Sequence, residues 1–199
     1  MKQVSNTKTI QKEMKTIKVG EIIMGTRVPY EYFITQGSGE SDLGYHPGAY
    51  DVALENAGGV QNYNHIVYSS ILPKEAVRIP VPPSDYDHGA VMESITAESG
   101  KGQEFPKRLT AGMVIAKVFK KGEYLGGLVA EYNGNDSKDD AKKFLKNNMQ
   151  GMLKRRYGEE GITTKEEYFV ESIEPKLKYA CAMVVLGFTS HKIPLLSRE

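Results

Sequence analysis

Short runs of β-branched and aromatic residues recur along the chain, and glycine, proline and polar residues separate them. Runs of this kind, bounded by turn-forming residues, are typical of β-strands. The pattern predicts strands at residues 27–35, 63–72, 88–97, 113–119, 124–132, 167–173 and 180–188. Residues 50–57 have the composition of a short helix, which the pair Gly58–Gly59 would terminate.

One segment has the clear period of an α-helix. Ser137 and Asp140 have the spacing of a capping box, with aspartate in place of the usual glutamate. Apolar residues then recur at helical spacing, at positions 141, 144, 145, 149, 152 and 153. The basic residues 154–156 complement the helix dipole, and Gly158 is placed to end the helix. The sequence therefore predicts a helix between Ser137 and Gly158.

The other segments are predicted to be irregular. Residues 36–48 carry four glycines together with serine, aspartate and proline, so a loop is expected there. Residues 1–24 are rich in lysine and threonine and are expected to form a disordered tail, with residues 25–199 as one domain. Many strands with two unevenly spaced helices predict an α+β fold, in which helices pack on mostly antiparallel sheet.

Composition excludes several kinds of partner. Lys plus Arg number 26 and Asp plus Glu 25, so the net charge of +1 gives no reason to expect nucleic acid or a membrane surface. The single cysteine, Cys181, excludes an internal disulfide and fits a cytoplasmic setting. No apolar run approaches the ~20 residues that span a bilayer. The four histidines have no metal-ligand spacing, so no metal is predicted.

The most promising site for chemistry is the pair Ser69–Ser70, where a predicted strand ends against Pro73. The sequence contains neither a phosphate-binding P-loop nor the G-x-S-x-G turn of α/β-hydrolases. Taken alone, the serine pair favours an unreactive strand end whose hydroxyls bond to nearby backbone groups. The residues around it change this interpretation.

Four sequence blocks surround or include the serine pair: GESD at 39–42, DVALENAG at 51–58, NHIVYSSILP at 64–73 and GGLVAEY at 126–132. Each block is weak alone, but their order and spacing together resemble the pyruvoyl-dependent arginine decarboxylase family. The resemblance extends from about residue 25 to residue 188. GESD, the HGAV segment at 88–91 and the length of residues 58–63 are similar to the bacterial and chlamydial branch of that family.

The resemblance implies a four-layer αββα sandwich that assembles as a trimer of cleaved protomers, with active sites at subunit interfaces. The chain would cut itself between Ser69 and Ser70 into residues 1–69 and 70–199. In the family's chemistry the serine hydroxyl attacks the preceding carbonyl to form an ester. Elimination and loss of ammonia then convert Ser70 into a pyruvoyl group. A Schiff base between this cofactor and L-arginine accepts the electrons released with CO2, and the product is agmatine.

The resemblance implies catalytic roles for two more residues, Glu131 and Ser69. The resemblance makes Glu131 the acid that protonates the substrate Cα. The apolar residues 128–130 before it predict desolvation, which favours the neutral carboxyl, although a strand carboxylate facing water is an equal alternative on local sequence. Ser69 would become a new carboxyl terminus beside the pyruvoyl group.

Two further residues are implied in recognition. Asn64 would bind the oxyanion of self-cleavage or the substrate carboxylate through its amide, and its alternative is an ordinary turn residue. Asp51 would pair with the substrate guanidinium. Because Glu55 lies one helical turn later, Asp51 is equally compatible with a solvated helix face.

Two rival functions stay open at this point. A pyruvoyl decarboxylase of another amino acid, such as histidine or ornithine, would differ mainly at Asp51 and the pocket wall. A binding module of the same fold would never cleave. The integrity of the purified chain separates this last alternative from the other two.

Overall fold

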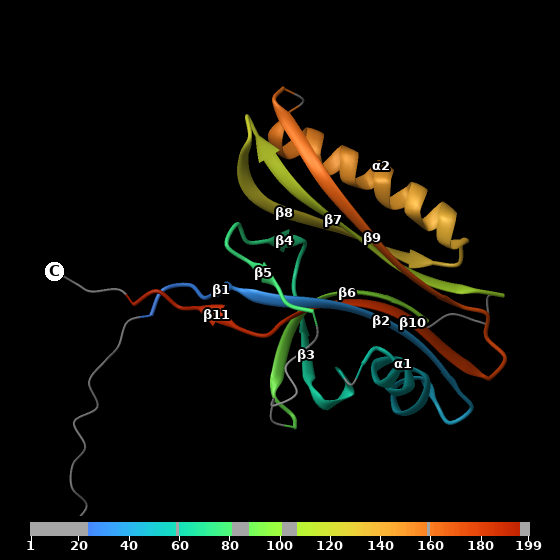
Figure 1. The fold of residues 1–199 in the computed structure, drawn as a ribbon. Coiled ribbons are helices and arrows are strands. Elements are labelled where there is room, and N and C mark those ends of the chain that lie inside the picture. Colours follow the sequence, from blue (N-terminus) through green and yellow to red (C-terminus); the bar gives the residue numbers. More distant parts are fainter. Residues whose placement is uncertain (1–23, 59, 81–87, 101–106, 159, 196–199) are drawn as a thin grey trace, which may run out of the picture. The chain divides into compact units, whose positions relative to one another are not determined.

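The computed structural model describes residues 24–58, 60–80, 88–100, 107–158 and 160–195. These residues belong to two units, of which the larger comprises Arg27–Lys192 (Figure 1). In the smaller unit, Met24 and Leu195 form an antiparallel bridge, and the Gly25 N–H donates to the Pro194 carbonyl. The tail predicted at residues 1–24 lies outside the described residues except for Met24, so its disorder stays a prediction.

Within the described residues, the larger unit contains two main sheets. The first has the strand order β3–β6–β10–β2–β5, and the second has the order β4–β8–β7–β9. The first sheet consists of β2 (Glu31–Ser41), β3 (Asn64–Val67), β5 (Val77–Arg78), β6 (Val91–Ser99) and β10 (Tyr179–Phe188). The second consists of β4 (Ile71–Leu72), β7 (Leu109–Lys120), β8 (Glu123–Gly134) and β9 (Ile162–Ile173). Pairing is antiparallel except for β3 with β6 and β5 with β2.

The remaining elements are short, apart from one long helix. A two-stranded ribbon joins β1 (Val28–Pro29) to β11 (His191–Lys192). The helical elements are η1 (Tyr45–Tyr50), α1 (Asp51–Asn56), η2 (Val60–Asn62) and α2 (Lys138–Tyr157). No helix among the described residues is long and apolar enough to cross a membrane.

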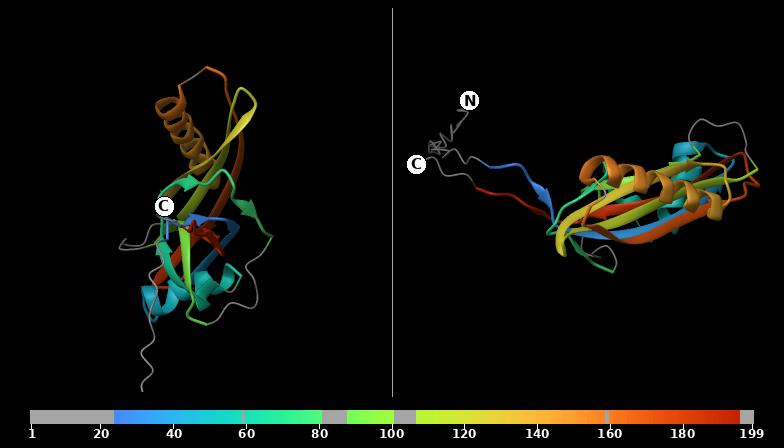
Figure 2. Two further views of the ribbon diagram at one scale, coloured as in Figure 1. Left: turned by 90° about the vertical axis from the view of Figure 1, so that its left-hand side faces the viewer. Right: turned by 90° about the horizontal axis from the view of Figure 1, so that it is seen from above.

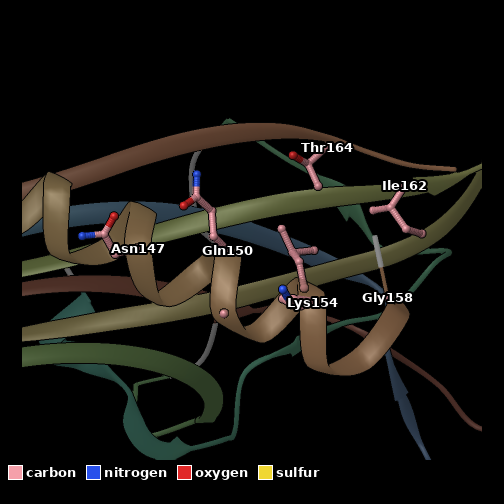
Figure 3. A pocket seen from close by; sticks show the side chains of 8 residues that line it. Asn147, Gln150, Lys154, Gly158, Ile162 and Thr164 are labelled. Carbon is pink, nitrogen blue, oxygen red and sulfur yellow. The ribbon is translucent and has the colours of Figure 1, made fainter. Parts of the chain in front are cut away.

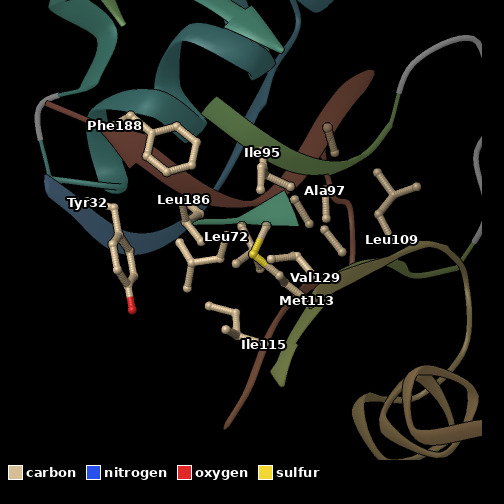
Figure 4. Packing of buried hydrophobic residues seen from close by; sticks show 14 residues of the cluster. Tyr32, Leu72, Ile95, Ala97, Leu109, Met113, Ile115, Val129, Leu186 and Phe188 are labelled. Carbon is tan, nitrogen blue, oxygen red and sulfur yellow. The ribbon is translucent and has the colours of Figure 1, made fainter. Parts of the chain in front are cut away.

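Three apolar clusters join these elements into four layers. One lies between the two sheets and includes Leu72, Ile95, Met113 and Val129 (Figure 4). A second joins α2 to the four-stranded sheet, and a third joins α1 to the five-stranded sheet. The order of layers in the described part of the larger unit is therefore α1, five-stranded sheet, four-stranded sheet, α2 (Figures 1 and 2). The predicted α+β class with mostly antiparallel sheet is confirmed.

The capping signals predicted for the long helix are also confirmed. The Ser137 hydroxyl oxygen accepts a hydrogen bond from the Asp140 backbone N–H at 3.1 Å, and this hydroxyl donates to the Asp140 carboxylate at 2.7 Å. The helix ends at Tyr157, and Gly158 follows with a positive φ of 75°. Its buried face consists of Ala141, Leu145, Met149 and Leu153.

The loop predicted at residues 36–48 is wrong at both ends, because β2 continues to Ser41 and η1 begins at Tyr45. The glycines there serve close packing rather than turning. A Cβ on Gly39 would lie 2.5 Å from the Ala53 nitrogen, and one on Gly37 would lie 2.4 Å from the Ala53 oxygen. Helix α1 therefore approaches the strand at a distance that only glycine allows.

Gly39→Ala is expected to lower the free energy of unfolding by about 1–3 kcal/mol, because the added methyl group pushes α1 away from β2. Urea denaturation measures the change. Gly151→Ala is the matched control, since a Cβ at that helical position meets nothing within 4 Å. The control should be neutral or stabilising, by up to about 1 kcal/mol. Equal effects of the two substitutions would contradict the packing role of Gly39.

Candidate active site

The serine pair lies where the chain passes from one sheet to the other. Residues 63–72 were predicted as one strand, which is wrong: β3 ends at Val67 in the five-stranded sheet, and β4 begins at Ile71 in the four-stranded sheet. The Tyr68 N–H donates to the Ser94 carbonyl of β6 at 2.6 Å. The Val129 N–H of β8 donates to the Ser70 carbonyl at 3.0 Å. The peptide bond between Ser69 and Ser70 therefore spans the gap between two anchored edges.

A tight turn surrounds this peptide bond. The Ile71 N–H donates to the Ser69 carbonyl at 3.0 Å, which is the hydrogen bond of a three-residue γ-turn centred on Ser70. Among the described residues other than glycine, only Lys121 has a positive φ, so the turn at Ser70 is of the inverse type. Ser69 is exposed and Ser70 is half-buried. The carbonyl that self-cleavage would attack thus already accepts a hydrogen bond from a backbone donor.

Glu131 lies on β8 and faces the layer between the sheets. Side chains alternate along a strand, and Val129 belongs to the inter-sheet cluster whereas Ala130 and Tyr132 pack toward α2. Glu131 therefore shares the face of Val129, about 7 Å further along β8. Burial raises the pKa of Glu131 above its ordinary value. The Glu131 side chain is therefore partly buried, as the sequence predicted, and does not face open water.

Asn64 and Asp51 are not brought to the serine pair within one chain. Asn64 begins β3, about 13 Å along the strand from Tyr68. Its amide donates to the Gly89 carbonyl at 2.7 Å. Asp51 begins α1 on the outer face of the five-stranded sheet, where its side chain is exposed. The roles predicted for these two residues therefore stay predictions that require a neighbouring subunit.

Four large apolar side chains on the strands around the serine pair are exposed, and we call them together the exposed apolar strip. It consists of Ile66, Val67, Ile71 and Val91, with exposed fractions of 46%, 62%, 43% and 58%. These residues lie on β3 and β4, which are the edge strands of their sheets, and at the start of β6 beside β3. Large side chains exposed together on a sheet edge are typical of a surface that another protein covers. The sequence predicted these residues as parts of two strands, 63–72 and 88–97, and gave no sign that their side chains are exposed.

One pocket lies on the α2 side of the four-stranded sheet. It has a volume of about 560 Å³ and lies between α2 and β9 (Figure 3). Its lining consists of Asn147, Gln150, Gly151, Leu153, Lys154, Gly158, Ile162 and Thr164. None of the predicted site residues contributes to it. The chemistry expected at Ser70 and Glu131 thus has no connection with this pocket.

Comparison with known proteins identifies the family. Residues 31–193 match the model of the pyruvoyl-dependent arginine decarboxylase family. The chain is 36% identical over 185 residues to the pyruvoyl-dependent arginine decarboxylase AaxB of Chlamydia abortus, covering 82% of this chain and 92% of the relative. Its identity to the Chlamydia caviae AaxB is 35% over the same coverage. An arginine decarboxylase of the same kind from Methanocaldococcus jannaschii is 30% identical over 128 residues, or 60% of this chain and 68% of the relative.

The fold and these matches define a lyase class that works through a covalently bound pyruvoyl group. The chain belongs to the pyruvoyl-dependent arginine decarboxylase family. The resemblance read from the four sequence blocks is confirmed, including its similarity to the chlamydial branch.

Proposed function

We propose that this chain cleaves itself between Ser69 and Ser70 and that the mature protein converts L-arginine to agmatine and CO2. The observation that carries the proposal is the γ-turn at Ser70, which lies between two anchored strands and polarises the Ser69 carbonyl. The chlamydial and archaeal relatives named as arginine decarboxylases support the substrate.

The residues present fit a serine-derived group. Attack of the Ser70 Oγ on the Ser69 carbonyl carbon closes a five-membered ring, and negative charge develops on the Ser69 oxygen. The Ile71 N–H, 3.0 Å from that oxygen, is placed to stabilise this charge. Collapse of the ring breaks the C–N bond and leaves an ester. Elimination then releases the Ser69 carboxylate, and hydrolysis with loss of ammonia gives the pyruvoyl group.

The pyruvoyl group supplies the electron sink that decarboxylation of an amino acid requires. Burial raises the pKa of Glu131 and so favours its protonated form, which suits it to protonate the substrate Cα after CO2 leaves. The inter-sheet layer around Glu131 is apolar, with Met113 paired opposite it and Val129 on the same face. Exclusion of water there would protect the carbanion from unspecific protonation.

The two fragments would remain together after cleavage. The N-terminal fragment contributes β2 and β3 to the five-stranded sheet, and both pair with strands of the C-terminal fragment, β10 and β6. The Ser69–Ser70 bond is thus dispensable for the sheet once the chain has folded. A cleaved protomer can keep Ser70 and Glu131 in place.

The complete active site is proposed to form between protomers of a homotrimer. The exposed apolar strip beside the serine pair offers a surface for a second copy. Within one chain, Asn64 and Asp51 lie away from the serine pair. A neighbouring copy could place its own Asn64 and Asp51 beside the substrate. Analytical ultracentrifugation of the purified protein tests the trimer, and a monomer at micromolar concentration would exclude it.

One experiment tests the cleavage and the substrate together. Intact-mass spectrometry should find two fragments, and the larger should be lighter by one ammonia than a fragment beginning with serine. The same sample should decarboxylate arginine without added pyridoxal phosphate. An uncleaved and inactive chain would favour the binding module, whereas a cleaved protein that prefers histidine or ornithine would preserve the chemistry but not the substrate.

Asp51→Asn is expected to raise the KM for arginine. If the neighbouring subunit buries the pair of Asp51 and guanidinium, the fall in kcat/KM should correspond to a loss of about 2–5 kcal/mol in transition-state stabilisation. Asparagine keeps the size of the side chain but loses the charge and the bidentate pairing with a guanidinium. Kinetics with arginine, ornithine and lysine measure the change in cleaved protein. Glu55→Gln is the matched control, since Glu55 is an exposed carboxylate one turn later on the same helix. Equal kinetics for both variants would assign Asp51 to a solvated face.

A further inference from the structure

A buried carboxylate lies close to the serine pair and has no part in the chemistry so far. Glu93 is only 3% exposed, although its side chain is a carboxyl group. On β6 it alternates with Ile95 and Ala97, which both belong to the inter-sheet cluster, so Glu93 faces the same layer. A charge in such a place requires a compensating partner. Arg27 provides it, through a contact of its guanidinium with Glu93 Oε1.

The same guanidinium reaches the residue that precedes the serine pair. Arg27 Nη2 donates to the Tyr68 hydroxyl at 3.4 Å. Tyr68 is held at two further points: its backbone N–H donates to the Ser94 carbonyl, and its ring packs against Phe188 with centroids 6.0 Å apart. Tyr68 thus fixes the chain on the side of the five-stranded sheet, immediately before the γ-turn.

A second basic side chain, His191, also lies against Glu93. His191 Nε2 contacts Glu93 Oε2, and this contact is an ion pair only when the imidazole ring is protonated. Burial and the nearby Arg27 charge lower the pKa of His191, which disfavours the charged form of its ring. Arg27, which is always protonated, is therefore the permanent cation beside the buried carboxylate.

We propose that Arg27, held by Glu93, is a positioning residue for self-cleavage: it fixes Tyr68 and so aligns the Ser69 carbonyl with the Ser70 hydroxyl. The proposal rests on the self-cleavage proposed above. Beyond the turn, the bond from Val129 to the Ser70 carbonyl fixes the chain on the side of the four-stranded sheet. With both ends held, only a few torsions between Tyr68 and Ser70 remain to be set. Intramolecular attack is sensitive to such alignment, and a displacement of about 1 Å can cost as much as 10²-fold in rate.

The test compares the rate of self-cleavage in Arg27→Met with that in wild type. Methionine keeps an apolar stem but removes the guanidinium. Freshly synthesised chain is followed by gel or mass spectrometry as it converts to fragments, and cleavage is expected to slow by about tenfold or more. Arg78→Met is the matched control, because Arg78 also forms a partly exposed ion pair, with Glu167 at 2.7 Å. The control should cleave at the wild-type rate.

A second variant separates alignment from stability. Arg27→Met alone leaves Glu93 buried without its cation, so the melting temperature should fall. Adding Glu93→Gln removes that charge and should recover much of the melting temperature, while cleavage should stay slow. If cleavage recovers together with stability, Arg27 has only a structural role and the proposal is wrong.

Tyr68→Phe tests the route through the tyrosine hydroxyl. It removes the atom that Arg27 contacts and keeps the ring on Phe188, so cleavage should slow by a few-fold. Wild-type cleavage rates in both Tyr68→Phe and Arg27→Met would overturn the proposal. If wild-type protein itself does not cleave, the self-cleavage proposal fails instead, which is a different result from fast cleavage in the variants.

Discussion

Ser70→Ala is expected to leave a single intact chain with no measurable arginine decarboxylation. Self-cleavage needs a β-oxygen that first attacks the Ser69 carbonyl and later departs as part of the Ser69 carboxylate, and alanine has none. The half-buried position of Ser70 in a short turn tolerates the smaller side chain, so folding should be preserved. A denaturing gel, intact-mass spectrometry and CO2 release measure the two outcomes. The expected loss of activity is essentially complete, because without the serine no pyruvoyl group forms.

Ser69→Ala is the matched control for processing. It keeps the carbonyl that is attacked and the hydrogen bond from the Ile71 N–H, which both belong to the backbone. Cleavage should therefore continue in this variant. An intact Ser69→Ala chain would mean that the Ser69 hydroxyl takes part in processing. Arginine decarboxylation by intact Ser70→Ala protein would exclude the pyruvoyl mechanism altogether.

The parts of the fold that local pattern determines were predictable. The helix after Ser137 carries its start signal, its apolar period and its terminal glycine within one segment, and all three are present in the structure. The long strands β7, β8 and β10 were likewise predicted in place, though too short at their ends. Local sequence contains the information for elements whose stability comes from their own period and caps.

The wrong predictions concern segments whose structure is determined by tertiary packing and not by local sequence. Gly37 and Gly39 predicted a loop because glycine disfavours strands, but the approach of α1 makes glycine necessary there. Residues 63–72 predicted one strand because no glycine or proline interrupts the segment before Pro73. The structure divides that segment between two sheets, and no local property of Tyr68 or Ser69 signals the crossing. The crossing places the serine pair, so the most important local geometry was the least predictable.

In the candidate site, too, only the features that local sequence determines were predictable. The apolar neighbours of Glu131 indicated desolvation, and burial does raise its pKa. Arg27 and Glu93 were overlooked, because they are 66 positions apart in sequence and neither belongs to a recognisable motif. One signal was available: Glu93 occupies a position in a predicted strand that alternates with apolar residues, where a charge needs a partner.

Glu131→Gln is expected to lower turnover by about 10²-fold or more while self-cleavage proceeds. Glutamine preserves the shape of the side chain but has no proton to deliver to Cα, and processing depends on Ser70 instead. Steady-state kinetics on fully cleaved protein measure the effect. Glu123→Gln is the matched control on the same strand, since that exposed carboxylate pairs only with Lys74 among the described residues, and it should not change turnover.

The pH dependence gives the same prediction a second, independent readout. Burial raises the pKa of Glu131 in the folded protein, so the unfolded chain loses this proton first as pH rises. Between the ordinary carboxyl pKa and the raised one, the unfolded state binds fewer protons, and the contribution of Glu131 to stability falls with increasing pH. Below that window the wild type and Glu131→Gln should have similar melting temperatures. Above it the melting temperature of the variant should rise relative to that of the wild type.

Turnover is the second measurement. The turnover of the wild type should decline over the same pH window, because the acid ionises there. The residual turnover of Glu131→Gln should not decline over this window. A variant with normal turnover and an unchanged pH profile would mean that another group protonates Cα.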